Sequence, residues 1–214
     1  MPLRNRATPF GEIVADPGRG TLMGNRGILH DAEGRLVRDS QVRRWIACRL
    51  EFRGRHRQLL QPGSYTELFF LDEAAAFAAG HRPCAECRHA DYRRFQSVWR
   101  QLHPEHGGGA DAIDAQLHIE RRAGPWRKRT HTAPLATLPD GAYIALDNRA
   151  WLVLGAELLA WSCGSYLEAR PRAREALVTV LTPPSLVRVL ARGYLPQLHP
   201  SAAPDLRPKT QPPE

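Results

Sequence analysis

Lysine is almost absent from this 214-residue chain, which contains only Lys128 and Lys209, so its 30 basic residues are nearly all arginine. They outnumber the 22 acidic residues and give a formal net charge of +8. Arginine makes planar, bidentate contacts to phosphate and carboxylate groups. The charge alone has two explanations, a compositional bias toward arginine and a general attraction to nucleic acids.

Long apolar segments are missing as well. No run approaches the ~20 apolar residues of a membrane-spanning helix. The first residues, Met1 to Arg6, lack the apolar segment of a secretory signal. We therefore expect a cytoplasmic protein with no membrane partner. Apolar residues make up 43% of the chain and charged residues 24%, which is typical of a globular protein with a sizeable core.

Cysteine is scarce, and four residues are too few and too scattered for a disulfide scaffold. Cys84 and Cys87 form a C-x-x-C motif, a spacing that lets two thiolates bind one Zn²⁺ at about 2.3 Å. A thioredoxin-like redox role requires a surrounding βαβ pattern, which the sequence does not show. Cys163 has no neighbouring His or Cys pattern, and we expect it to be structural. Cys48 lies on the apolar face of an alternating segment, where an ordinary buried thiol is the alternative to a ligand.

The residues around the C-x-x-C motif are more specific than the cysteines themselves. Two segments, Leu68–Ala74 and Ala78–Arg88, resemble the second half of the Ada-type metal-binding domain. In that domain a strand ending in Phe and a helix beginning Glu-Ala precede an A-G-(aromatic)-R-P-C-x-x-C motif. His81 stands at the aromatic position and is the only departure within these segments.

The resemblance implies a small zinc domain whose C-x-x-C pair is completed by two ligands from an earlier segment. In Ada DNA-repair regulators the domain binds DNA, and one zinc-bound cysteine accepts a methyl group from a damaged phosphate. The family's upstream C-x-x-x-C is absent here, so methyl acceptance is not carried over. We expect Cys48 and His30 as the upstream ligands, because residues 24–30 resemble the run that precedes the ligand histidine of some relatives. His81 and His89 are the alternatives to His30.

Two basic clusters accompany the motif. The first runs from Arg43 to Arg57 with a turn at Arg53-Gly54, and the second surrounds Trp126. Interleaved arginine and aromatic residues are typical of nucleic-acid surfaces. A solvated face with Trp126 packed inward is the alternative. The residues that we expect to contact phosphates are Arg49, Arg53, Arg55, Arg57, Arg127, Lys128 and Arg129.

A helix expected over residues 111–122 carries the candidate catalytic residues Asp111, Asp114, His118 and Glu120. Asp111, Asp114 and His118 share one face, where they could hold a metal or act as acid and base. Zinc deaminases combine an H-x-E motif such as His118-Ile119-Glu120 with P-C-x-x-C, but in the opposite order. A solvent-facing row of ion pairs is the alternative.

Hydrophobic periodicity and turn residues predict an α+β fold. We expect an N-terminal region over 1–105 with the Ada-like zinc module at about 20–100, a mixed helix and strand region over 106–199, and a disordered proline-rich tail over 200–214. Strands are predicted at 45–52, 65–71, 143–146, 151–154 and 177–181, with a return arm at 55–60. Helices are predicted at 73–79, from near residue 83, at 111–122 and at 185–191. Asp72 and Gly80 are expected to begin and end the first helix, and Ser185 to cap the last.

The sequence therefore predicts a zinc-binding protein that binds DNA through backbone phosphates, in repair, regulation or processing, with Zn²⁺ as its cofactor. One alternative is a metal-dependent enzyme acting on nucleic acid or a nucleobase, nuclease-like or deaminase-like. Another is a structural zinc protein with a protein partner.

Overall fold

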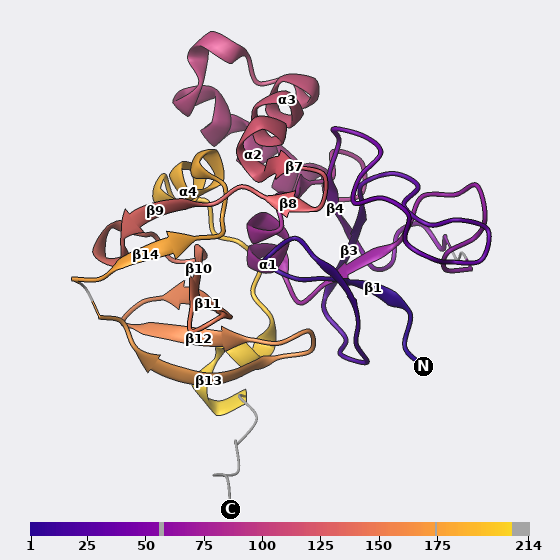
Figure 1. Cartoon of the computed structure of the whole chain (residues 1–214). Helices are drawn as coiled ribbons and strands as arrows, with labels where there is room; N and C mark the ends of the chain where they lie inside the picture. Colours follow the sequence, from indigo (N-terminus) through magenta and orange to yellow (C-terminus); the bar gives the residue numbers. More distant parts are fainter. Residues whose placement is uncertain (56–57, 174, 207–214) are drawn as a thin grey trace, which may run out of the picture.

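The chain forms two six-stranded β-sheets, with one short helix between them and three longer helices on one side (Figure 1). The structure, a computed structural model, describes residues 1–55, 58–173 and 175–206. Its strands and helices confirm the predicted α+β class. No helix among the described residues is long and apolar enough to cross a membrane.

The first sheet is mixed and has the strand order β2-β1-β5-β3-β4-β6. Most neighbours are antiparallel, but β1 pairs with β5 and β4 pairs with β6 in the parallel sense. The pairing of β4 with β6 matters most for function, because it sets two segments that are distant in sequence side by side. The strands are β1 (Arg4–Ala7), β2 (Ile13–Ala15), β3 (Leu22–Asn25), β4 (Ile46–Arg49), β5 (Leu68–Phe70) and β6 (Arg82–Pro83).

The second sheet is antiparallel throughout and has the order β13-β12-β11-β10-β14-β9. Asp147 and Asn148 join β10 to β11 with φ angles of 53° and 57°, the left-handed pair that a tight two-residue hairpin requires. The strands are β9 (His131–Pro134), β10 (Tyr143–Leu146), β11 (Arg149–Leu154), β12 (Glu157–Trp161), β13 (Tyr166–Pro171) and β14 (Leu177–Val180). A separate small hairpin consists of β7 (Arg122–Gly124) and β8 (Arg127–Lys128).

The described residues also form four α-helices: α1 (Glu73–Ala78), α2 (His89–Leu102), α3 (Ala110–Arg121) and α4 (Pro184–Ala191). The predicted cap of α1 is confirmed, because the Asp72 side chain accepts a hydrogen bond from the amide of Ala75. The predicted end is confirmed as well. Gly80 has a φ of 88°, its amide donates to Phe77 O, and the His81 amide donates to Ala76 O, which is the hydrogen-bond pattern of a Schellman motif. Short 3-10 turns lie at Pro104–His106, Leu135–Thr137, Pro200–Ala202 and Pro204–Leu206.

Helix α1 is buried along its whole length and contributes to every part of the core. Phe77 packs with an aromatic stripe of α2, Tyr92, Phe95 and Trp99, against the second sheet. Ala74 packs with Tyr143 and other residues of the same sheet, whereas Ala76 packs against the first sheet. The two sheets therefore share one helix as their common core element.

The polar N-terminus of α1 is satisfied by residues from the C-terminal part of the chain. Asp72 Oδ2 accepts hydrogen bonds from the Tyr166 hydroxyl at 2.6 Å and from the His199 amide at 3.0 Å. Glu73 accepts from the Tyr194 hydroxyl at 2.8 Å and lies 2.9 Å from Arg88 Nη2. Buried carboxylates need such partners, since an unpaired charge in a protein interior is strongly unfavourable.

Three local expectations differ from the structure. Helix α2 begins at His89 rather than near residue 83, because the C-x-x-C residues form a turn before it. Ser185 lies inside α4 and does not cap it; the Glu120 carboxylate accepts from its amide at 2.8 Å and from its hydroxyl at 2.6 Å. The described part of the return arm, residues 55 and 58–60, forms no strand.

The predicted disordered tail begins within ordered structure. Ser201 is buried, and its hydroxyl accepts a hydrogen bond from the Tyr166 amide at 2.8 Å. Residues 207–214 lie outside the described part of the chain. The division of the chain near residue 105 stays a prediction.

We expect Glu73→Ala to lower the free energy of unfolding by about 3–5 kcal/mol, because it leaves the buried Arg88 guanidinium without one of its carboxylates. Glu33→Ala is the matched control, since Glu33 pairs with the exposed Arg35. Breaking such a surface pair should cost less than about 1 kcal/mol. Urea denaturation followed by circular dichroism measures both values, and equal losses in the two variants would contradict the role assigned to Glu73.

Candidate metal centre

Cys48 and the C-x-x-C motif are brought together by the parallel pairing of β4 with β6. Ala47 is the register partner of Pro83, and the amide of Cys84 donates to Ala47 O at 2.9 Å. The residue after Ala47 therefore lies beside the loop that carries Cys84. The amide of Arg88 donates to Cys84 O at 3.1 Å, which closes a turn around Cys87 before α2 begins.

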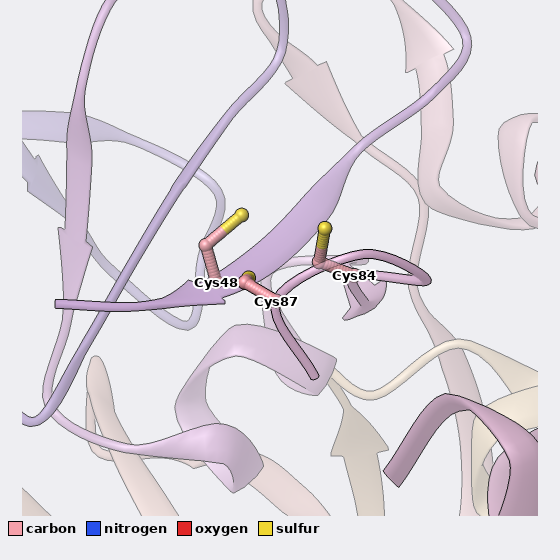
Figure 2. A group of neighbouring side chains, drawn as sticks. All are labelled: Cys48, Cys84 and Cys87. Atoms are coloured by element: carbon pink, nitrogen blue, oxygen red, sulfur yellow. The ribbon is translucent and has the colours of Figure 1, made fainter. Parts of the chain in front are cut away.

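The sulfur atoms of Cys48, Cys84 and Cys87 all lie within 4.8 Å of one another. Figure 2 shows them around a common space, with Cys48 on its strand and the other two on the loop. Cys84 and Cys87 are buried and Cys48 is half-buried, and none of the three is in a disulfide. No other group of three or more His, Cys, Asp or Glu ligand atoms gathers in this way within the described residues.

The three thiols share a hydrogen-bond network that favours a thiolate. Hydrogen bonds from the thiols of Cys48 and Cys87 lower the pKa of Cys84, and the backbone amides of Cys87 and Glu86 lower it further. The same interaction raises the pKa of Cys48, which keeps its proton as the donor. A thiolate held by backbone amides is the form of cysteine that binds metals.

This donor set fits a zinc ion. Tetrahedral Zn²⁺ with Zn–S bonds of about 2.3 Å separates its sulfur ligands by about 3.8 Å. A group of sulfurs within 4.8 Å of one another can close to that spacing by small side-chain rotations. Bound zinc would fasten the end of β4 to the start of α2, where the loop otherwise relies on a few backbone hydrogen bonds.

The three candidate histidines do not lie in this group. His30 is buried elsewhere, with Nδ1 2.6 Å from Thr66 Oγ1 and Nε2 3.4 Å from Gln61 O. His81 is buried between the rings of Trp45 and Phe70, and His89 is exposed at the start of α2. The described residues thus supply three of the expected ligands, Cys48, Cys84 and Cys87, and place no fourth His, Cys, Asp or Glu beside them.

The candidate catalytic residues of α3 are dispersed among separate partners. Asp114 is buried and accepts two hydrogen bonds from Arg82, at 3.0 and 2.7 Å. Glu120 is occupied by the first turn of α4, Asp111 is exposed, and His118 is half-buried. These contacts give Asp114 and Glu120 structural roles. No observation favours the alternative of a metal-dependent enzyme over the other functions.

The basic residues expected to contact phosphate fall into two places. Arg49, Arg53 and Arg55 are exposed beside the cysteine group, and Arg127 and Arg129 are exposed on or after β8. Lys128 is half-buried and donates to Ala78 O, so its amine faces the protein rather than the solvent that surrounds Arg127 and Arg129. Arg57 lies outside the described residues.

One feature that sequence patterns did not indicate is a pair of buried arginines around Trp45. The guanidinium carbons of Arg26 and Arg121 each lie 4.1 Å from the centre of the Trp45 ring. Sequence spacing gives no sign of this arrangement, because the three residues come from three distant segments. A glycine-flanked arginine at position 26 is the nearest local signal.

Comparison with protein-family models, with curated proteins and with solved structures found no match. The resemblance to the Ada-type domain therefore has one structural counterpart, the cluster of three cysteines that could bind a metal.

We expect protein purified without added metal to contain one zinc ion per chain, measured by elemental mass spectrometry. Cys48→Ser and Cys84→Ser should lose the metal, because each removes one of three clustered thiolates. Cys163→Ser is the matched control, since Cys163 is a buried cysteine outside the group. His30→Ala should keep its zinc. Metal-free wild-type protein, or equal zinc in all variants, would contradict the assignment.

Removal of the metal by a chelator should also destabilise the fold. Structural zinc contributes directly to folding free energy. A loss of several kcal/mol would lower Tm by about 10 °C or more, at about 2–4 °C per kcal/mol for a chain of this size. Differential scanning calorimetry with and without chelator measures this shift, and an unchanged Tm would show that the site carries no structural metal.

Proposed function

We propose that this chain is a zinc-thiolate protein that binds DNA through backbone phosphates, with zinc holding the arginine-bearing segment in place. The observation that supports the proposal most directly is the cysteine cluster, because Cys48 is followed at once by Arg49 and the exposed basic segment. Metal binding would therefore organise the basic surface as well as the fold.

The basic segment is in contact with the cysteine loop. Arg55 Nη2 lies 3.0 Å from Oε1 of Glu86, the residue between Cys84 and Cys87. Arg53 and Arg55 both lie over the Phe52 ring, with guanidinium carbons 5.0 and 5.4 Å from its centre. These contacts keep two guanidinium groups close together on one exposed surface.

The chemistry of this surface favours phosphates over base edges. Exposed arginines neutralise backbone phosphates and release counterions without reading sequence. Neither Arg49 nor Arg53 pairs with a carboxylate in the part of the chain that the structure describes. We expect binding with little sequence preference and a steep dependence on salt.

The same cysteines support a proposal for the compartment and for the role of the metal. Free thiols and a thiolate metal site fit a reducing compartment, and we propose the cytoplasm. Zinc in this proposal has a structural role, because it ties β4 to the loop before α2. A protein partner in place of DNA is the alternative that the binding experiment excludes or supports.

Fluorescence anisotropy with a labelled blunt DNA duplex carrying 5′-hydroxyl ends measures the dissociation constant over a series of salt concentrations. The double variant Arg53→Gln, Arg55→Gln should bind more weakly at every salt concentration. The slope of log K against log salt should fall by about 2, since each phosphate contact contributes about 0.9.

The control double variant is Arg149→Gln, Arg170→Gln, which removes the same charge from two arginines of the second sheet that pair with Glu168 and Asp147. Its slope should equal that of the wild type. An equal slope in the test variant would contradict the phosphate surface, whereas no binding at low salt would contradict the proposed function and favour a protein partner.

A further inference from the structure

A pocket of about 420 Å³ lies between the first sheet and the β7–β8 hairpin, and no cysteine lines it. Its volume lies in the range of small-molecule sites. Its walls come from the β1–β2 turn, the segments after β3 and before β4, the end of α1 and the hairpin. Six basic residues line it, Arg4, Arg26, Arg121, Arg122, Arg127 and Lys128, against two acidic residues, Glu12 and Asp39.

Two of these arginines are buried and have no carboxylate partner in the described part of the chain. Arg26 and Arg121 are 1% and 2% exposed. Arg26 donates to Gly11 O at 2.9 Å and to His81 Nε2 at 3.3 Å, and its Nη2 has no partner among the described residues. Arg121 donates to the carbonyl oxygens of Gly80 and Arg43. Both guanidinium groups are therefore held by neutral groups only.

The other two buried arginines among the described residues, Arg82 and Arg88, each have a carboxylate partner. Arg82 lies 2.7 Å from Asp114, and Arg88 lies 2.9 Å from Glu73 and 2.8 Å from Asp91. Buried charges are normally paired in this way. The two arginines at the pocket depart from the pattern that the chain follows elsewhere, so the missing negative charge points to a ligand.

The acidic residues of the pocket do not supply the missing charge. Asp39 accepts two hydrogen bonds from Arg122, at 3.2 and 3.1 Å, and one from the Trp126 amide at 3.0 Å. Glu12 is exposed on the β1–β2 turn. Burial lowers the pKa of Arg26 to about 9 and that of Arg121 to about 9, in spite of Asp39 near the first and Asp114 near the second.

Trp126 adds an aromatic surface to this positive pocket. It is 55% exposed and adopts a φ of 57°, a left-handed conformation that is unfavourable for a bulky residue. The hydrogen bond from its amide to Asp39 fixes the turn. A strained residue that keeps an indole in solvent beside a basic pocket is a feature of ligand sites.

We propose that this pocket binds the phosphate monoester of a nucleotide, with Arg26, Arg121 and Lys128 around the phosphate. The base lies against the indole of Trp126, in the manner of base stacking on aromatic side chains. The nucleotide is either free or the 5′-phosphorylated end of a DNA strand. Only the second source rests on the proposed DNA-binding function.

Isothermal titration calorimetry with AMP tests the site, with adenosine as the ligand that lacks the phosphate. AMP should bind and adenosine should not. Trp126→Ala and Arg127→Gln should each weaken AMP binding about tenfold, the effect of one lost stacking or charged contact. Both side chains are exposed, so these variants should fold. Arg26→Gln should abolish binding, and circular dichroism shows whether that variant is folded.

Arg129→Gln is the matched control for Arg127→Gln, because Arg129 follows the same hairpin but does not line the pocket. Its affinity for AMP should equal that of the wild type. Absence of AMP binding at millimolar concentration, or equal affinity in wild type, Trp126→Ala and Arg127→Gln, would overturn the proposal.

Proton uptake gives an independent readout. Burial and the charges of Arg26 and Arg121 lower the pKa of Lys128 to about 7, so part of the population is uncharged at pH 7.5. A phosphate beside the amine favours its charged form, and binding should take up protons. Titrations in buffers of different ionisation enthalpy measure this number. Lys128→Gln should remove the uptake, whereas uptake that persists would come from His81 or His131 and contradict the placement.

Two oligonucleotides distinguish the sources of the phosphate. If a strand end is the ligand, a single strand with a 5′-phosphate should bind about tenfold more tightly than the same strand with a 5′-hydroxyl. If a free nucleotide is the ligand, AMP should bind more tightly than both oligonucleotides. The duplex used for the arginine surface has no 5′-phosphate. AMP binding without duplex binding would therefore contradict only the proposed function. Duplex binding without binding of AMP or of the 5′-phosphorylated strand would contradict only the proposed nucleotide site.

Discussion

Burial of two carboxylates at the start of α1 is the constraint on which the rest of the structure depends. The helix is enclosed on every side, so Asp72 and Glu73 must find their donors within the protein. Those donors come from different parts of the chain: Arg88 before α2, Tyr166 in the second sheet, and Tyr194 near the C-terminal end. Any packing that satisfies both carboxylates therefore fixes the two sheets and the terminal segment around one short helix.

The opposite end of α1 organises the two candidate sites. The chain leaves the helix at Gly80, and β6 then places Cys84 beside Cys48 after very few residues. Carbonyl groups at and just after the end of α1 accept hydrogen bonds from cations, Ala78 O from Lys128 and Gly80 O from Arg121. Exposed carbonyl groups at a helix C-terminus favour positive charge. Helix α1 thus holds carboxylates at its first turn, while its last turn supports the metal loop and the positive pocket.

Local features were predictable from the sequence, and long-range pairings were not. The capping role of Asp72 and the left-handed conformation of Gly80 depend on near neighbours, so spacing was enough to predict them. The spacing of Cys84 and Cys87 likewise predicted that these two residues form part of a metal site. His30 was expected beside it, yet the contact with Thr66 that holds His30 arises only when the first sheet forms. Composition could not separate an arginine paired with a buried carboxylate from one that lines a pocket, because that difference depends on which acidic residue the fold brings close.

The bonds to Asp72 and Glu73 also relate the fold to the order in which the chain is synthesised. Helix α1 leaves the ribosome long before Tyr166, Tyr194 and the amides of Gln197 and His199 that complete its first turn. Until these late residues emerge, the carboxylates of Asp72 and Glu73, which are buried in the folded protein, remain hydrated. Helix α1 therefore cannot complete the hydrogen bonds of its first turn before residue 199 has left the ribosome, so the N-terminal half of the chain depends on late residues for its final packing.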